Sequence, residues 1–286
     1  MPHAHPDFDR ILAAARRASS GPVLVLGPVD SGKTTLVRSL ASALAAETPV
    51  LVVDADVGQS WIGPPATLGR ACIPRPRKRW TALKPQRLVF FGATSPAPAT
   101  RACADALVRL VRDARPPVLV DTPGLVKGLP AEALWRRVAS RLTPGLVVAV
   151  RAGVDLGPVL RPFRDAEFRV LECDADPRVR VRRRDQRARY RDAAYRRALR
   201  GARVRWAAHA RLAVRPAFPW RPAALEPGRL VGLRDAAGRD LAIGVVRTVG
   251  RTRLGVLTSL DGLRDVSTVI LGTLCVDPAT GREAPR

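Results

Sequence analysis

Short, uninterrupted apolar runs recur along the first 150 residues and predict the strands of a buried sheet. A strand that is apolar on both faces is typical of a parallel sheet with both faces covered, since an exposed face would alternate with polar residues. These runs are 22–26, 50–53, 88–91, 118–120 and 146–150.

Helical patterns separate these runs, with amphipathic stretches at 35–46, 100–113 and 131–141. Strands that alternate with helices predict an α/β fold in which helices flank a parallel sheet. In such a fold the carboxyl ends of the strands meet at one edge, where ligands bind.

The pattern changes after residue 175. Pro177 suits a first helical position, Asp176 can cap it, and the next helix breaker is Gly201, so one long arginine-studded helix is predicted. A proline-rich hinge at 215–227 precedes four short apolar runs, which predict a small β domain. The runs are 230–233, 241–246, 254–257 and 269–274. The predicted division is an N-terminal segment 1–20, a main domain 21–175, a helix and hinge 176–221, and a β domain 222–286.

Composition changes this picture mainly through charge. A hydrophobic content of 47% excludes a wholly disordered chain. The formal net charge is +24, which favours a polyanionic partner such as nucleic acid. Nearly all of this charge is arginine, and GC-rich coding would give the same composition, so charge alone leaves both explanations open.

The four cysteines lie far apart and form no C-x-x-C pair, which predicts reduced thiols. No apolar run approaches the roughly 20 residues that cross a bilayer, and residues 1–10 lack the apolar stretch of a signal peptide. We therefore expect a soluble, cytoplasmic protein with no membrane partner.

A phosphate-binding loop follows the first predicted strand. Its sequence fits G-x-x-x-x-G-K-[ST] between a strand and a helix, the context that this motif requires. Backbone N–H groups of such a loop face phosphate oxygens, Lys33 is expected to bridge the β- and γ-phosphates, and the Thr34 hydroxyl to hold Mg²⁺. The predicted nucleotide-binding residues are Gly27, Pro28, Val29, Asp30, Ser31, Gly32, Lys33, Thr34 and Thr35.

An acidic loop follows the second strand. Asp54 and Asp56 suggest two roles beside a phosphate loop, one in supporting Mg²⁺ and one in accepting a proton from an attacking hydroxyl. Asp56 is the predicted base because it lies farther from the strand, and Asp54 is the alternative. Gln59 is expected to orient the acceptor.

A third loop, Asp121-Thr122-Pro123-Gly124, follows the fourth strand. D-x-x-G is also how a GTPase presents its γ-phosphate switch, so a GTPase-like switch or metallochaperone that uses Asp121 is a second hypothesis. The chain has no N-K-x-D guanine-reading motif, which disfavours an ordinary GTPase.

Four motifs together resemble the polynucleotide 5′-hydroxyl kinases, in the branch of the messenger-RNA cleavage-factor kinase and the ribosomal-RNA-processing kinase. The similarity runs from about Gly21 to the end of the chain. In order, the motifs are 27–35, 54–59, 91–96 and 122–128.

This resemblance implies a P-loop NTPase fold, an arginine-rich helical lid and an enzyme that transfers phosphate from ATP or GTP, with Mg²⁺, to a 5′-OH end of RNA or DNA. It implies that Asp56 activates the hydroxyl and contributes with Thr34 to the metal site. The implied acceptor clasp contains Thr122, Pro123, Gly124, Lys127 and Gly128, with Gln59 nearby, and the implied lid arginines are Arg180, Arg183, Arg184 and Arg187.

Two features depart from the family pattern. The clasp usually has a tryptophan where this chain has Leu125, and Trp61 or Trp135 are candidate substitutes. The chain also has no counterpart of the large N-terminal domain of eukaryotic members, so we expect a minimal, prokaryotic enzyme.

The arginines after residue 179 recur at three- and four-residue steps, which places several of them on one side of a helix. Their planar guanidinium groups suit phosphate, although a solvated helix face paired with Asp185 and Asp192 is the alternative. A cluster at 75–80, with four basic residues and Trp80, is either a single-strand contact or a solvated loop. A non-catalytic RNA-binding protein is the third hypothesis.

Overall fold

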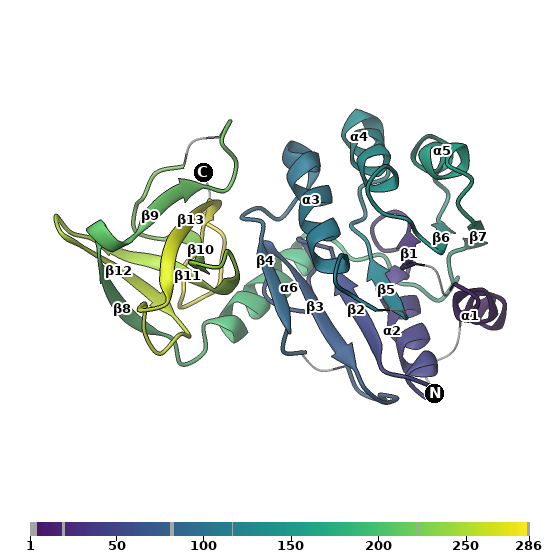
Figure 1. The fold of residues 1–286 in the computed structure, drawn as a ribbon, viewed down its shortest axis with the longest axis horizontal. Helices are drawn as coiled ribbons and strands as arrows, with labels where there is room; N and C mark the ends of the chain where they lie inside the picture. The colour runs from purple at the N-terminus through teal and green to yellow at the C-terminus, as the bar shows by residue number, and fades with distance from the viewer. Residues whose placement is uncertain (1–4, 19–20, 81–82, 116, 222, 285–286) are drawn as a thin grey trace. The chain divides into compact units, whose positions relative to one another are not determined.

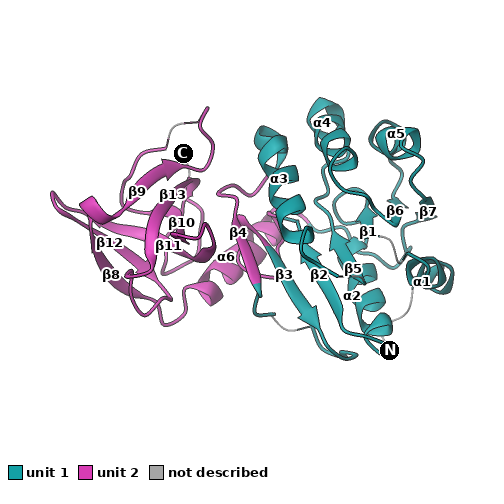
Figure 2. Cartoon of the chain, viewed as in Figure 1, with its two compact units in different colours: residues 1–56, 69–86, 96–182 teal, residues 57–68, 87–95, 183–286 magenta. Residues whose placement is uncertain are grey.

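The computed structural model describes residues 5–18, 21–80, 83–115, 117–221 and 223–284. Residues 1–4 and 19–20 of the predicted N-terminal segment, and residue 222 of the predicted hinge, lie outside the described residues. The chain forms two compact units (Figure 2). Unit 1 contains 1–56, 69–86 and 96–182, and unit 2 contains 57–68, 87–95 and 183–286.

Unit 1 is built on a sheet whose strands run in the order β3-β2-β5-β1-β6-β7. Neighbouring strands are parallel except that β3 runs antiparallel to β2. Every residue of β1 and β5 is buried, as their continuous apolar sequences predict. The strands are β1 (Val23–Leu26), β2 (Val50–Asp54), β3 (Thr67–Ile73), β5 (Val118–Asp121), β6 (Leu146–Arg151) and β7 (Val170–Asp174).

Helices cover both faces of this sheet (Figure 1). Helices α3, α4 and α5 form one layer and α1 and α2 the other, so the predicted α/β architecture is confirmed. The sequence did not predict α1, α5, β3 or β7. The helices are α1 (Phe8–Arg16), α2 (Lys33–Leu44), the short η1 (Ala97–Ala99), α3 (Thr100–Val111), α4 (Gly128–Ala139) and α5 (Gly157–Asp165).

Unit 2 is a six-stranded sheet in the order β8-β12-β11-β10-β13-β9, antiparallel except where β13 meets β9. Its core packs Val231, Val246, Val256 and Val269. The four predicted runs are confirmed as β10 to β13, whereas β8 and β9 are additional. The elements are β4 (Arg87–Phe90), α6 (Arg184–Ala198), β8 (Arg203–Ala208), η2 (His209–Arg211), β9 (Ala213–Pro216), β10 (Arg229–Asp235), β11 (Asp240–Val249), β12 (Arg253–Thr258) and β13 (Val266–Cys275).

The predicted helix from Asp176 to Gly201 is wrong in its first part, because α6 begins only at Arg184. The Arg183 backbone N–H donates to Gln186 Oε1 at 2.8 Å, which caps the helix there. Valines alternate with arginines over 178–182, a period of two that favours extended backbone over helix. Within the described part of the chain, no helix is both long and apolar enough to cross a bilayer.

Candidate functional site

The phosphate loop of unit 1 joins β1 to α2, as the motif requires. Gly32 is the N-cap of α2 with φ +86°, a left-handed conformation that glycine adopts without steric cost. At Gly27, a side chain would clash with the Val150 carbonyl oxygen, because its Cβ would lie 2.5 Å away. The sequence therefore fixes a tight loop that aims the amino end of α2 outward.

A segment after β7 lies against this loop, which sequence reasoning missed. The Arg182 backbone N–H donates to Asp30 Oδ2 at 3.0 Å, and a Cβ on Gly32 would lie 2.8 Å from Val179 Cγ2. Asp30 itself has φ +57°, so the loop holds a strained non-glycine residue at this contact. The valine–arginine alternation was the available signal for this extended segment.

Lys33 is buried at the centre of the site, with 6% of its surface exposed. Its Nζ donates to the Pro28 carbonyl oxygen at 2.6 Å. Burial lowers the pKa of Lys33, while the negative charges of Asp121, Asp56 and Asp30 oppose that shift. The ammonium therefore lies near carboxylates from three loops.

The loop that follows β2 and the loop that follows β5 lie side by side. Asp54 pairs with Asp121 in the register of β2 and β5, and the Ala55 backbone N–H donates to the Asp121 carbonyl at 2.8 Å. Asp54 is fully buried, and its Oδ1 accepts the Asp56 N–H at 3.1 Å. Asp56 is only half-buried, so its carboxylate is the more accessible to an acceptor.

The loop after β5 is fastened to the phosphate loop. The Thr122 hydroxyl donates to the Val25 carbonyl at 2.8 Å. Gly124 packs so closely that an added Cβ would lie 2.7 Å from the Val29 nitrogen. Lys127 is the N-cap of α4, and Gly128 follows it with φ +76°. Thr122 and Gly124 of the predicted clasp are therefore held against the phosphate loop and the strand before it.

Neither candidate substitute for the missing clasp tryptophan presents a free ring. Trp135 is fully buried, donates from Nε1 to the Leu125 carbonyl at 2.8 Å, and lies 6.4 Å from the Phe163 ring. Trp61 is buried in unit 2. The suggestion that either ring stacks on a base is wrong. Trp135 instead anchors the clasp loop through its hydrogen bond to Leu125.

The predicted lid arginines do not share one helix. Arg180 belongs to the non-helical segment that precedes α6 and lies in unit 1, Arg183 is the N-cap of α6, and Arg184 and Arg187 lie in α6. Their predicted placement on one side of a single helix is therefore wrong for the first two. In unit 2, Gln59 Nε2 donates to the Arg187 carbonyl at 3.3 Å, so the end of the acidic loop contacts α6.

The basic cluster at 75–80 lies away from the phosphate loop. Because β3 is antiparallel to β2, Ile73 pairs with Val50 and the chain leaves the sheet at the edge opposite Asp54. Ser42 Oγ accepts the Arg77 N–H at 3.0 Å, which holds this segment to α2. The cluster therefore does not contribute to the nucleotide site.

Comparison with known proteins agrees with this geometry. The family model described as "mRNA cleavage and polyadenylation factor CLP1 P-loop" matches residues 27–201. The polyribonucleotide 5′-hydroxyl-kinase of Pyrococcus horikoshii is 31% identical over 173 residues, or 58% of this chain and 48% of that protein. The enzyme of the same name from Methanocaldococcus jannaschii is 33% identical over 50% of this chain and 40% of its own. The chain spans about half the length of these curated relatives.

Solved structures give the same fold. A wild-type complex of Clp1p with residues 454–563 of Pcf11p matches with a TM-score of 0.74 at 14% identity, over 96% of this chain and 80% of that one. A second complex of the same two proteins matches with a TM-score of 0.72 at 15% identity. At such identity the likeness concerns the fold alone.

Proposed function

Because the chain belongs to the CLP1 P-loop family, we propose that it is a polynucleotide 5′-hydroxyl kinase. In this proposal it transfers the γ-phosphate of ATP or GTP to the 5′-OH end of RNA or DNA, as a cytoplasmic enzyme. The curated relatives named polyribonucleotide 5′-hydroxyl-kinase support RNA as the first acceptor to test.

One observation carries the proposal: a half-buried carboxylate, Asp56, acts electrostatically on the buried phosphate-loop lysine. A P-loop alone supports only nucleotide binding. A carboxylate beside it, accessible at the carboxyl edge of the sheet, can accept the proton of an attacking hydroxyl. The assignment of Asp56 rather than Asp54 as base rests on burial, because Asp54 is inaccessible and already accepts a backbone N–H.

The nucleotide would be held by the loop 27–35. Ser31 Oγ is buried, and no other described residue offers it a hydrogen-bond partner, so it suits a phosphate oxygen. Lys33 would neutralise charge between the β- and γ-phosphates, and the amino end of α2 adds the positive end of its dipole. The segment 176–182 would close one side of this cradle.

Mg²⁺ fits the oxygen donors of this edge, since it prefers carboxylates, hydroxyls and substrate phosphates. The described residues include no group of three or more His, Cys, Asp or Glu that could hold an ion by themselves. Mg²⁺ needs only one or two protein ligands beside a nucleotide, so Thr34 and Asp56 are the proposed ones, with Asp54 and Asp121 in support. When bound, the ion would neutralise charge on the phosphates.

The acceptor end would lie against the loop 122–128. In the proposed reaction Asp56 takes the proton of the 5′-hydroxyl, and the oxygen forms a bond to the γ-phosphorus. The bond from that phosphorus to the β,γ-bridging oxygen breaks, and the nucleoside diphosphate leaves with the electron pair. Lys33 and the arginines Arg180, Arg183, Arg184 and Arg187 are proposed to stabilise the charge on the moving group, and Gln59 and Lys127 to orient the acceptor.

The experiment is an acceptor screen with the full chain and γ-labelled nucleotide. Oligonucleotides with a 5′-OH should become labelled, whereas the same oligonucleotides with a 5′-phosphate should not. Comparing RNA, DNA and duplex ends, each with ATP and with GTP, identifies both substrates. Hydrolysis that no oligonucleotide changes, with no labelled product, would support the GTPase-like alternative that uses Asp121. Oligonucleotide binding that is insensitive to Lys33→Ala, again without labelled product, would support the third hypothesis, a non-catalytic RNA-binding protein.

A further inference from the structure

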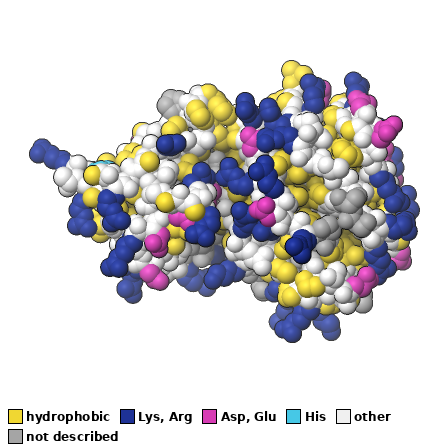
Figure 3. All heavy atoms as spheres, viewed as in Figure 1, with side chains coloured by type: hydrophobic (Ala, Val, Ile, Leu, Met, Phe, Trp, Pro, Cys, Tyr) yellow, Lys and Arg dark blue, Asp and Glu magenta, His cyan; other side chains and the backbone are white. Residues whose placement is uncertain are grey.

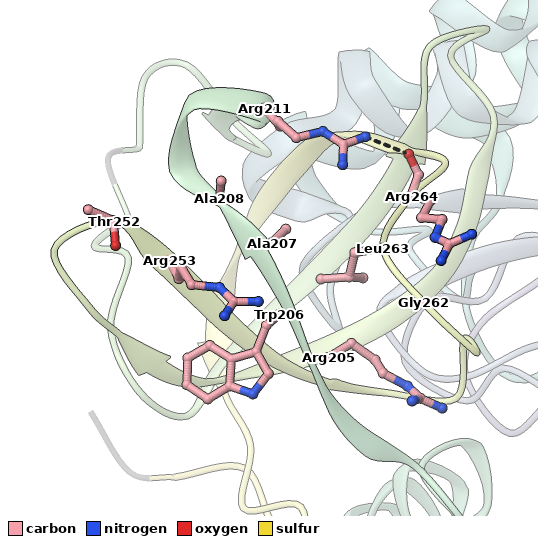
Figure 4. A pocket seen from close by; sticks show the side chains of 10 residues that line it. All are labelled: Arg205, Trp206, Ala207, Ala208, Arg211, Thr252, Arg253, Gly262, Leu263 and Arg264. Carbon is pink, nitrogen blue, oxygen red and sulfur yellow. Dashed lines mark hydrogen bonds between the residues drawn. The ribbon is translucent and has the colours of Figure 1, made fainter.

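An open pocket lies at strand β8 of unit 2, far along the sequence from the phosphate loop (Figure 4). Its volume is about 520 Å³. Four of its ten lining residues are arginines and none is acidic. The lining residues are Arg205, Trp206, Ala207, Ala208, Arg211, Thr252, Arg253, Gly262, Leu263 and Arg264.

Trp206 presents an aromatic face in this pocket, with 46% of its surface exposed. It pairs across the strands with Gly255, and the absence of a side chain there lets the indole lie on β12, since an added Cβ would sit 3.1 Å from the ring. The Arg253 guanidinium carbon is 5.8 Å from the ring centroid. This cation–π geometry holds a flat, exposed ring beside a positive charge.

The other arginines lie around the same strand. Arg205 Nε donates to the Leu260 carbonyl at 3.1 Å, and Arg211 Nη2 to the Arg264 carbonyl at 3.3 Å. These bonds to carbonyl groups orient the guanidinium groups and leave their positive charge uncompensated. Figure 4 shows Trp206 and Arg253 on one side of β8, and Arg205 and Arg264 on the other.

Carboxylates do not neutralise the pocket. The loop that carries Arg264 also contains the exposed Asp261 and Asp265, but no carboxylate of the described residues comes within 4.0 Å of the four lining arginines to form a salt bridge. Figure 3 shows that basic side chains are widespread and acidic ones sparse on the visible face of the protein. What distinguishes the pocket is an exposed indole with Arg253 beside it and further arginines across β8.

We propose that this pocket binds a single strand of nucleic acid, with one base stacked on Trp206 and the flanking phosphates on the arginines. The combination of an aromatic platform and a basic groove is how proteins hold single strands without reading their sequence. A duplex would keep its bases stacked and leave the indole unused, and an acidic peptide would need the arginines but not the ring. The inference rests on the proposed function in one respect: the bound strand is taken to belong to the acceptor, at nucleotides that follow its 5′ end.

The test is equilibrium binding of a fluorescent single-stranded oligoribonucleotide to the full chain. Trp206→Thr, which keeps a β-favouring residue, should weaken binding by roughly 5- to 100-fold, and Trp206→Phe should retain most of it. Arg253→Ala should lower the slope of log affinity against log salt by about 0.7, as expected for the loss of one phosphate contact to a single strand.

Arg112→Ala is the matched control, because this substitution removes the same charge at an exposed position, the C-cap of α3 in unit 1. Equal binding by wild type and Trp206→Thr, or equal losses for Arg253→Ala and Arg112→Ala, would overturn the proposal. Tighter competition by duplex or by an acidic peptide would also contradict it. Binding is measured without nucleotide, so a failed kinase assay leaves this result unaffected, and a melting curve of each variant verifies its fold.

Discussion

Two carboxylates lie at the carboxyl end of β2, and their different burial gives each a different role. Asp54 is sealed between strands and orders the turn by accepting the Asp56 N–H, while Asp56 reaches the accessible side. The sequence placed both beside the phosphate loop, because strand ends can be located from apolar runs. It could not distinguish Asp54 from Asp56 physically, since burial depends on the neighbouring strands.

Asp56→Asn tests whether the Asp56 carboxylate is the proton acceptor. It keeps the side-chain volume and removes the proton acceptor, so we expect kcat for transfer to fall by about 10²- to 10⁴-fold at saturating nucleotide and Mg²⁺. Initial rates and nucleotide binding should be measured for the same preparation. Asp165→Asn, at an exposed position at the end of α5, is the control and should match wild type. An unchanged rate for Asp56→Asn would remove this residue from the chemistry.

Asp54→Asn should behave differently from Asp56→Asn. An amide nitrogen in place of one buried oxygen weakens acceptance of the Asp56 N–H, so we expect a lower melting temperature together with a reduced rate. The loss of a buried hydrogen bond costs on the order of 1–3 kcal/mol. A variant as stable as wild type but equally inactive as Asp56→Asn would make Asp54 the base.

At the scale of elements, the clasp loop and the phosphate loop are packed too closely for a side chain at Gly124. An added Cβ would lie 2.5 Å from Val29 Cγ2 and 2.7 Å from the Val29 nitrogen. Gly124→Ala must therefore move backbone, and we expect a marked loss of nucleotide affinity by calorimetry. Gly262→Ala is the matched control, because a Cβ added at this glycine would meet no atom beyond its chain neighbours within 4 Å. Wild-type affinity in Gly124→Ala would show that the two loops are not coupled.

The extended segment over the phosphate loop depends on Asp176. Its carboxylate accepts hydrogen bonds from Arg178 Nε and Nη2 at 2.8 and 2.7 Å, and chiefly these bonds lower the pKa of Asp176 from 3.8 to about 2. A carboxylate whose pKa is lower in the folded than in the unfolded state stabilises the folded state at pH values above its unfolded-state pKa. That contribution disappears as the pH falls through its folded-state pKa.

Asp176→Asn should therefore be less stable than wild type above about pH 4, with the difference shrinking to little near pH 2. Urea denaturation across this range measures it. Hydrogen exchange of the Arg182 amide, which bonds to Asp30, should rise in the variant as the segment loosens. A stability difference that stays constant with pH would contradict this account of Asp176.

Sequence patterns predicted elements more reliably where burial is uniform than where it is not. The all-buried β1 and β5 were evident as apolar runs, whereas β8 and β9 are exposed along much of their length and carry little such signal. The arginine-rich helix was extended too far because its start was inferred from Asp176 and Pro177. The actual start, at Arg184, is set by a cap from Gln186.

At the scale of the whole molecule, the predicted reduced thiols are confirmed, since all four cysteines are free. Burial raises the pKa of Cys103 to about 12 and that of Cys173 to about 11. The thiolate is the reactive form, so at pH 8 these two should resist alkylation until the chain unfolds, whereas the half-buried Cys72 and Cys275 should react first. Mass spectrometry of labelled peptides verifies the order. Early labelling of Cys103 would show that unit 1 opens locally.

The net charge of +24 belongs to the whole chain, and sequence alone could not separate coding bias from nucleic-acid binding. In two places the structure gives an arginine a specific neighbour: the Arg182 backbone N–H donates to Asp30 of the phosphate loop, and the Arg253 guanidinium lies beside an exposed indole. Elsewhere many arginines pair with carboxylates at the surface, as Arg189 does with Asp185 and Arg16 with Glu47, and such pairs contribute little to stability.

A single turnover with enzyme in excess over γ-labelled nucleotide separates phosphate transfer to a hydroxyl from hydrolysis. With a 5′-OH oligoribonucleotide present, the label should appear on the 5′ end of the oligonucleotide in wild type. In Asp56→Asn this product should form far more slowly. Label found only in inorganic phosphate, at the same rate with and without the acceptor, would show that the site hydrolyses nucleotide and is not a 5′-hydroxyl kinase.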